Sequence, residues 1–370
     1  MNRKYNIWSL EMFSSIKFIW KAKIFFIIII LFFGGCSKRD IVFDESKIIQ
    51  ETYSRSPFIS ESILSVSDTL KQPSVIRVNP GSRDITVLDK ENKCLYTFNE
   101  NGEFLKKISE AGDWSGAITI PSTFEIKQDG TIYINEPSRK VLMLFDKDGE
   151  FMREILLDLP LLSPFYISFS DKLLINQPFN EHFFTELFSD GSFNKNIDKI
   201  SEMPKQSQAN IQALLGGSPA VDNDGNYYIY LPRLGVLRIV DSQDTFKERF
   251  LLDFIPELKG IFSYFPDPDN LDDVKTYAFY FYDFTLLNNR LYLSFLNHEG
   301  EAYNDFKLVT YVINTDLIVE KRIVMVLPEK LDYKPRDNVK IEITDDGNTI
   351  YVPMNTKPLI LKFTKPDLNK

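Results

Sequence analysis

Histidine is the first residue type to consider for chemistry, because its imidazole binds transition metals and titrates near neutral pH. The chain has only two, His182 and His298, and each falls in a predicted loop between strands. A histidine-based zinc centre needs three nitrogen donors around one ion, which two residues cannot supply. We therefore expect surface or packing roles, or places in a ligand-binding loop, with a mixed His/carboxylate metal site as the alternative.

Carboxylates offer a second route to catalysis. Glu125, Asp283 and Glu342 lie in or beside short segments with the pattern of β-strands, far apart along the chain. If those strands met around one axis, the three side chains could hold a single divalent ion and support a metal-dependent hydrolase or lyase. Axial carboxylates without metal are the simpler expectation, so we predict no cofactor and keep one axial divalent ion as the alternative.

An aromatic segment and two arginines are candidates for ligand binding. The long connection 252–281 combines acids with aromatic residues that suit a sugar face or a peptide side chain. Its candidates are Tyr264, Phe265 and Tyr277. Arg139 and Arg233 lie in predicted loops on the same side and could bind a carboxylate through two hydrogen bonds. The alternatives are rings buried over their own strands and arginines in surface salt bridges.

The N-terminus has the organisation of an export signal. Basic residues precede an apolar run from Ile24 to Phe33, which ends at Gly34, Gly35 and Cys36. About ten apolar residues are too few for a membrane-spanning helix, which needs roughly 20. The pattern resembles a bacterial lipoprotein signal, which implies removal of residues 1–35 and lipidation of the Cys36 thiol. Met12 is a second candidate start, and an uncleaved anchor helix is the alternative.

Charge and composition narrow the classes of partner. The chain carries a net charge of −9, and removal of residues 1–35 takes away five basic side chains and one acidic one, giving −13. Such an acidic surface repels phosphates, so we exclude nucleic acid as a partner. Contact with a membrane must then come from the lipid on Cys36. Hydrophobic residues at 44% provide a large core, and Cys94, the one other cysteine, cannot form an intramolecular disulfide with a lipidated Cys36.

Internal repetition predicts the fold. Six segments repeat a β-branched or aromatic strand, a loop, a second apolar strand and often a third, and each follows a further short strand candidate. They begin at residues 84, 131, 172, 226, 290 and 348. Four antiparallel strands joined by tight hairpins form one propeller blade. We predict an all-β, six-bladed β-propeller of four-stranded antiparallel blades.

Turn chemistry orients the predicted blades. Gly-containing turns such as Gln128-Asp129-Gly130 and Asp146-Lys147-Asp148-Gly149 place the short hairpins on one face. The longer connections, among them 109–121, 198–217 and 252–281, then lie on the opposite face, where we expect any ligand. Asp148 and the pair Asp222 and Asp224 belong to turns, because the spacing of a calcium loop is missing.

The last repeat is one strand short, which leaves an unpaired sheet edge. The stretch 58–66 is the strand-like segment that precedes the first repeat, so we predict that it pairs with 358–365 and closes the ring. The expected organisation is a signal peptide at 1–35, a lipidated Cys36 with a tether at 36–57, and a propeller at 58–370.

The repeats resemble NHL-type propellers, and more closely the six-bladed propeller lipoproteins abundant in Bacteroidetes. The resemblance rests on the I-Y-[IV]-x-[ED] strand and [FV]-D-x-x-G-x-F turn, clearest at 132–151, together with Cys36 and its preceding glycines. It implies an outer-membrane lipoprotein facing the periplasm or the cell surface. It carries no activity, so we expect a non-catalytic binding or scaffold module for a peptide, glycan or envelope protein. The alternatives are the metal-dependent enzyme and a purely structural envelope component.

Overall fold

The computed structural model describes residues 44–60, 70–112, 114–157, 165–168, 172–176, 182–199, 218–231, 236–243, 245–251, 255, 281–298, 306–327, 340–354 and 358–366. The chain divides into two units, Met1–Asp40 and Ile41–Lys370, and all described residues belong to the second. Within the described part, no helix is long and apolar enough to span a membrane. Cys36 and the preceding signal lie outside the described residues.

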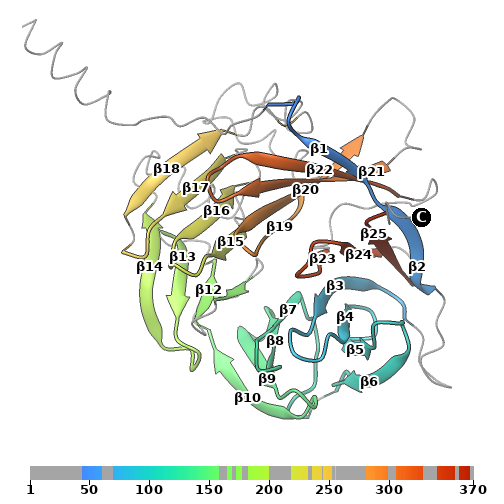
Figure 1. The fold of residues 1–370 in the computed structure, drawn as a ribbon. Coiled ribbons are helices and arrows are strands. Elements are labelled where there is room, and N and C mark those ends of the chain that lie inside the picture. The colour runs from blue at the N-terminus through green and yellow to red at the C-terminus, as the bar shows by residue number, and fades with distance from the viewer. Residues whose placement is uncertain are drawn as a thin grey trace, which may run out of the picture. The chain divides into compact units, whose positions relative to one another are not determined.

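The described residues of the second unit form six β-sheets, which we number as blades in chain order (Figure 1). Blade one contains β3 (Pro73–Val78), β4 (Ile85–Asp89), β5 (Cys94–Phe98) and β6 (Phe104–Ile108). Blade two contains β7 (Thr123–Ile126), β8 (Ile132–Glu136), β9 (Val141–Phe145) and β10 (Phe151–Leu156). Blade three contains β11 (Tyr166–Ile167), β12 (Leu173–Ile175), β13 (His182–Leu187) and β14 (Phe193–Lys199).

The other three blades follow the same order, with additions from the N-terminus. Blade four contains β15 (Ser218–Val221), β16 (Tyr227–Leu231), β17 (Val236–Val240) and β18 (Phe246–Leu251). Blade five contains β19 (Phe281–Leu287), β20 (Arg290–His298), β21 (Phe306–Asn314), β22 (Val319–Val326) and β1 (Ile49–Thr52). Blade six contains β23 (Glu342–Ile343), β24 (Thr349–Met354), β25 (Leu359–Thr364) and β2 (Ser54–Ser60). The prediction of an all-β six-bladed propeller closed by an N-terminal strand is confirmed.

Apolar strands in the middle of each blade explain why the repeats stack. β9 reads VLMLF and is buried along its whole length, because both faces of its sheet are covered by neighbouring blades. Its Met143 packs in one core cluster with Ile134 of the same blade and with Val75 and Leu88 of blade one. The interface between blades one and two is therefore a hydrophobic layer, as expected for a repeat fold.

The glycine turns take the conformation that the sequence predicts. Gly130 has φ of 88° and Gly149 has φ of 90°, values in the left-handed region that favours glycine. A Cβ at Gly149 would also come within 2.8 Å of the Ile108 side chain on the neighbouring blade. The turn between β9 and β10 thus needs glycine for both conformation and contact with blade one.

The closing strand begins four residues before the expected start at residue 58. β2 covers Ser54–Ser60, and it runs antiparallel to β25 from Ser54 opposite Thr364 to Ser60 opposite Leu359. Residues 61–66 of the predicted strand lie outside the described residues. Pro57 lies in this outermost strand, where a missing backbone N–H is tolerated. Phe58 fixes the strand on the blade, because its ring packs edge-on against Tyr351 with centroids 4.9 Å apart.

A second N-terminal strand was not expected. Residues 49–52, assigned to the tether from sequence, form β1, which pairs in parallel with β22 as a fifth strand of blade five. The following residue, Tyr53, is 4% exposed and donates a hydrogen bond from its hydroxyl to the Gly347 carbonyl of blade six at 2.7 Å. Its backbone N–H bonds to the Val324 carbonyl of blade five at 3.1 Å. The N-terminal segment therefore joins two blades rather than one.

Candidate functional site

A cavity of about 870 Å³ runs along the axis of the propeller. Its lining comes from the innermost strands of all six blades, β3, β7, β11, β15, β19 and β23, or from residues beside them. The lining also includes Asn79, Gln128, Asn288 and Asp345, which lie in the short hairpins that follow the inner strands. The cavity therefore reaches the hairpin face, whereas any ligand was expected on the face of the long connections.

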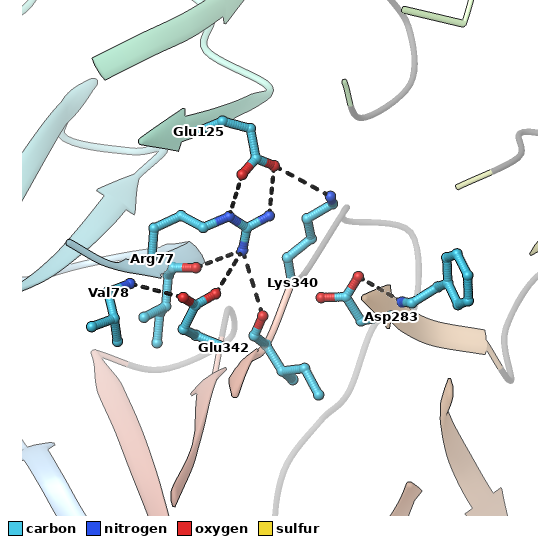
Figure 2. Close-up of polar contacts among 9 residues, drawn as sticks. Arg77, Val78, Glu125, Asp283, Lys340 and Glu342 are labelled. Carbon is cyan, nitrogen blue, oxygen red and sulfur yellow. Dashed lines mark hydrogen bonds and ion pairs between the residues drawn. The ribbon is translucent and has the colours of Figure 1, made fainter. Parts of the chain in front are cut away.

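Five charged side chains gather in this cavity and form what we call the axial charge cluster. Its members are Arg77, Glu125, Asp283, Lys340 and Glu342, contributed by blades one, two, five and six (Figure 2). All five come from or beside inner strands, so the ring closure brings together residues separated by up to 265 positions. The cluster is the main concentration of charge in the lining.

Arg77 lies at the centre of the cluster. Its Nε and Nη2 donate to the two carboxylate oxygens of Glu125 at 2.6 and 2.7 Å, a bidentate pair. Its Nη1 donates to the Ile76 carbonyl at 2.6 Å and lies 3.4 Å from Glu342 Oε2. Burial disfavours the guanidinium charge, but the Glu125 carboxylate outweighs it and raises the pKa of Arg77. This arginine is therefore a fixed cation that uses most of its donors within the protein.

Glu342 is held by two donors from blade one. Its Oε1 accepts a hydrogen bond from the Val78 backbone N–H at 3.0 Å, while Oε2 faces Arg77. Burial raises the pKa of Glu342 to about 7, although Arg77 acts in the opposite direction. The carboxyl group is consequently poised to bind a proton near neutral pH.

Lys340 and Asp283 are less completely engaged. Within the described part of the chain, Lys340 Nζ has one ion pair, to Glu125 Oε1 at 3.7 Å, and no hydrogen bond. Asp283 Oδ1 accepts from the Phe284 backbone N–H at 2.8 Å, and no other described donor reaches this carboxylate. Burial lowers the pKa of Lys340 and raises that of Asp283, so both environments disfavour charge.

The three acids singled out from sequence thus do line one axial cavity, but Glu125 and Glu342 pair there with Arg77, and Glu125 also with Lys340, two cations that were not predicted, whereas Asp283 pairs with neither. Both oxygens of Glu125 and both of Glu342 already accept hydrogen bonds or ion pairs, so this donor set does not fit a divalent ion. Across the described residues, no group of three or more His, Cys, Asp or Glu side chains has the arrangement of a metal site. The guanidinium of Arg77 neutralises charge where an ion would otherwise be needed.

A known protein family shares this fold. The model of a family described as a 6-bladed β-propeller, DUF5128, matches residues 64–306. The chain belongs to the DUF5128 family. No curated protein matches its sequence.

Solved structures share the propeller fold at low sequence identity. A member of the DUF4221 family from Bacteroides vulgatus aligns with a TM-score of 0.55 and 10% identity, covering 86% of this chain and 97% of that one. A Bacteroides fragilis protein described as exported gives a TM-score of 0.54 and 14% identity, covering 86% and 99%. A virginiamycin B lyase from Staphylococcus aureus gives 0.51 and 12%, covering 85% and 100%. At these identities the likeness shows the fold alone.

The histidines lie apart from the axial charge cluster. His182 begins β13 and His298 ends β20, so both belong to strands rather than to the loops expected from sequence. They pair with Lys199 and Phe306 in blades three and five respectively. His182 does not line the axial cavity, and the side chain of His298 lies outside what the structure describes.

Arg139 lies between β8 and β9, as expected, but it is already paired. Its guanidinium forms an ion pair with Glu154 and a hydrogen bond to the Ala117 carbonyl at 3.4 Å. A ligand would have to compete with these contacts. The other candidates, Arg233, Tyr264, Phe265 and Tyr277, lie outside the described residues.

Proposed function

We propose that this DUF5128 chain is a non-catalytic binding module of the cell envelope, anchored in the outer membrane through lipid on Cys36. Its ligand, a peptide, a glycan or part of an envelope protein, binds at the propeller axis. The lipid is the membrane contact, and the acidic mature chain has no role with nucleic acid. Support for the anchor comes from the residues around Cys36 alone.

One observation carries the proposal: Arg77 binds both oxygens of Glu125 and approaches Glu342. The axial carboxylates are thereby neutralised by the chain itself, which favours a preformed polar cavity over a metal centre. A volume of about 870 Å³ lies in the range of small-molecule sites, roughly 300–1,000 Å³. The cavity is large enough to accept a ligand without rearrangement of the blades.

The metal requirement separates this proposal from the alternative of a hydrolase or lyase. The full lipidated chain, purified in detergent without chelator, is analysed for bound metals, and its thermal unfolding is followed with EDTA, Ca²⁺ or Zn²⁺. We expect no stoichiometric divalent ion and an unchanged midpoint. One ion per chain, with a midpoint that falls in EDTA, would instead favour the enzyme.

The position of the ligand is tested by photo-crosslinking in cells. A photoreactive residue replaces Gln128 at the hairpin-face mouth of the cavity, Ile120 in the long connection 109–121, or Met152 on the outer strand β10. We expect adducts from Gln128 or Ile120 and none from the exposed control Met152. Equal adducts at all three positions, or adducts from Met152 alone, would contradict an axial site.

The enzyme remains a second candidate because three carboxylates do converge on the axis from blades two, five and six. Chemistry there would use Lys340 and Asp283, the two members of the axial charge cluster with spare hydrogen-bonding capacity. Turnover by the metal-free chain would require such a role for these two residues.

A further inference from the structure

Two buried charged groups in the axial cavity have hydrogen-bonding capacity that the described residues do not fill. Asp283 is 6% exposed and the Lys340 side chain 12% exposed, and both line the cavity. Lys340 has three N–H donors, yet its nearest described partner is Glu125 at 3.7 Å, beyond hydrogen-bonding distance. No contact joins Lys340 to Asp283 in Figure 2, although each shifts the pKa of the other.

Such groups call for a partner. A mostly desolvated ammonium or carboxylate with unfilled hydrogen-bonding capacity is destabilising, and in native proteins such a group is usually met by a polar partner or by water. Arg77, by contrast, uses most of its five N–H donors on Glu125, Glu342 and two backbone carbonyls, so it mainly positions the cluster. Lys340 and Asp283 are therefore the two residues whose unfilled hydrogen-bonding capacity indicates the chemistry of the ligand.

The surrounding charges determine which net charge the ligand can carry. An anion at Lys340 would lie close to Glu125 and Glu342, and a cation at Asp283 would lie close to Arg77. Burial also pushes the pKa of Lys340 down and that of Asp283 up, so the cavity penalises charge of either sign. A neutral ligand avoids both repulsions.

Hydroxyl groups satisfy both residues without adding charge. A hydroxyl accepts a hydrogen bond from an ammonium and donates its own proton to a carboxylate. Tyr166, which lines the same cavity, offers an aromatic ring against which the C–H face of a sugar can pack. We infer that the axial cavity binds a small neutral saccharide whose hydroxyl groups bridge Lys340 and Asp283. This inference rests on the proposed function and specifies its ligand class.

The test uses the full lipidated chain in a detergent without a sugar headgroup. Thermal unfolding and isothermal titration are measured with glucose, galactose, mannose and N-acetylglucosamine, and with glycine and acetate as zwitterionic and anionic comparators. Ligand that binds the native state raises the midpoint by mass action. We expect at least one saccharide to bind and to raise the midpoint, and neither comparator to do so.

Substitutions at Lys340 and Asp283 test whether the saccharide binds at these residues. Lys340→Met and Asp283→Asn should each weaken saccharide binding about tenfold or more, as expected for loss of a hydrogen bond to a charged group. Lys147→Ala is the matched control, because this exposed lysine lies in a hairpin away from the axial cavity and should bind as the parent does. Circular dichroism establishes that each variant is folded.

Three results would overturn the inference: no saccharide binds the parent chain, glycine or acetate binds in place of a saccharide, or both folded variants retain full affinity. If Lys340→Met does not fold, Asp283→Asn and the ligand panel on the parent chain still decide. Axial crosslinks from Gln128 in a chain that binds no saccharide would leave the binding module intact and remove only its ligand class.

Discussion

At the scale of single residues, the axis shows how a propeller tolerates five buried or nearly buried charges. Arg77 supplies a planar donor group that matches the Glu125 carboxylate in two parallel hydrogen bonds, a geometry that lysine cannot reproduce. The same side chain reaches Glu342 and two backbone carbonyls. Because so many contacts converge on it, its loss would leave two carboxylates without their main partner.

We predict that Arg77→Met destabilises the chain by about 3–5 kcal/mol, the cost of removing one partner of a buried ion pair. Denaturant unfolding followed by circular dichroism measures the change. Arg83→Ala is the matched control, since this exposed arginine lies in the adjacent hairpin and its loss should change stability by no more than about 0.5 kcal/mol. Equal stability of the two variants would show that the Arg77 pairs contribute nothing net.

At the scale of elements, the N-terminal strands do more than complete a sheet. Glu51 of β1 binds Lys321 of blade five at 3.6 Å and Lys365 of blade six at 2.9 Å. Tyr53 packs in one hydrophobic cluster with Ile323 of blade five and Val352 of blade six. The segment between β1 and β2 thus seals the interface between the last two blades.

Tyr53→Ala should cost about 3–5 kcal/mol, because it removes a buried aromatic ring and leaves the Gly347 carbonyl without its donor. Thermal or denaturant unfolding tests this, with Ile49→Ala as the control. Ile49 lies in the same strand segment but is 55% exposed, so its truncation should have little effect. A Tyr53→Ala chain as stable as the Ile49→Ala chain would mean that the seal is dispensable.

At the scale of the whole molecule, the proposed location in the outer membrane depends on one thiol. The sequence before Cys36 predicts lipidation there, and Cys94, the other cysteine, is buried in β5. We predict that Cys36→Ala abolishes labelling by a fatty-acid probe and releases the protein from the membrane fraction. Cys94→Ala should retain both labelling and membrane association. Persistent labelling of the Cys36→Ala chain would defeat the lipoprotein assignment.

The repeat pattern was sufficient to predict the blades, because alternating apolar strands and Gly turns are local signals. β15, the strand expected before the repeat that begins at residue 226, is present as Ser218–Val221. Strand bounds at the N-terminus were less predictable, since FISESILSV looks more like a strand than SRSPFIS, whereas β2 takes its register from the neighbouring β25. The parallel pairing of β1 left no periodic signal in its four residues.

Only part of the axial charge cluster was predicted from sequence: the three acids were, and the two cations were not. Glu125, Asp283 and Glu342 could be placed on the axis because charged residues in inner strands must face it. The same reasoning applied to Arg77 and Lys340 would have exposed the neutralising cations. The pairing of acids with cations depends on contacts between blades, such as that of Arg77 in β3 with Glu125 in β7. The sequence pattern carries no information on such contacts.

The parallel pairing of β1 with β22 also has a mechanical meaning. A pull on the chain ahead of Ile49 meets β1 before it meets the closing strand β2. Because β1 lies alongside β22 over four residue pairs, a pull directed along the strand would load its hydrogen bonds together in shear rather than one at a time. For a protein tethered by its N-terminus, the pairing of β1 with β22 would carry tension on the anchor before that tension reached the pairing of β2 with β25, which closes the ring.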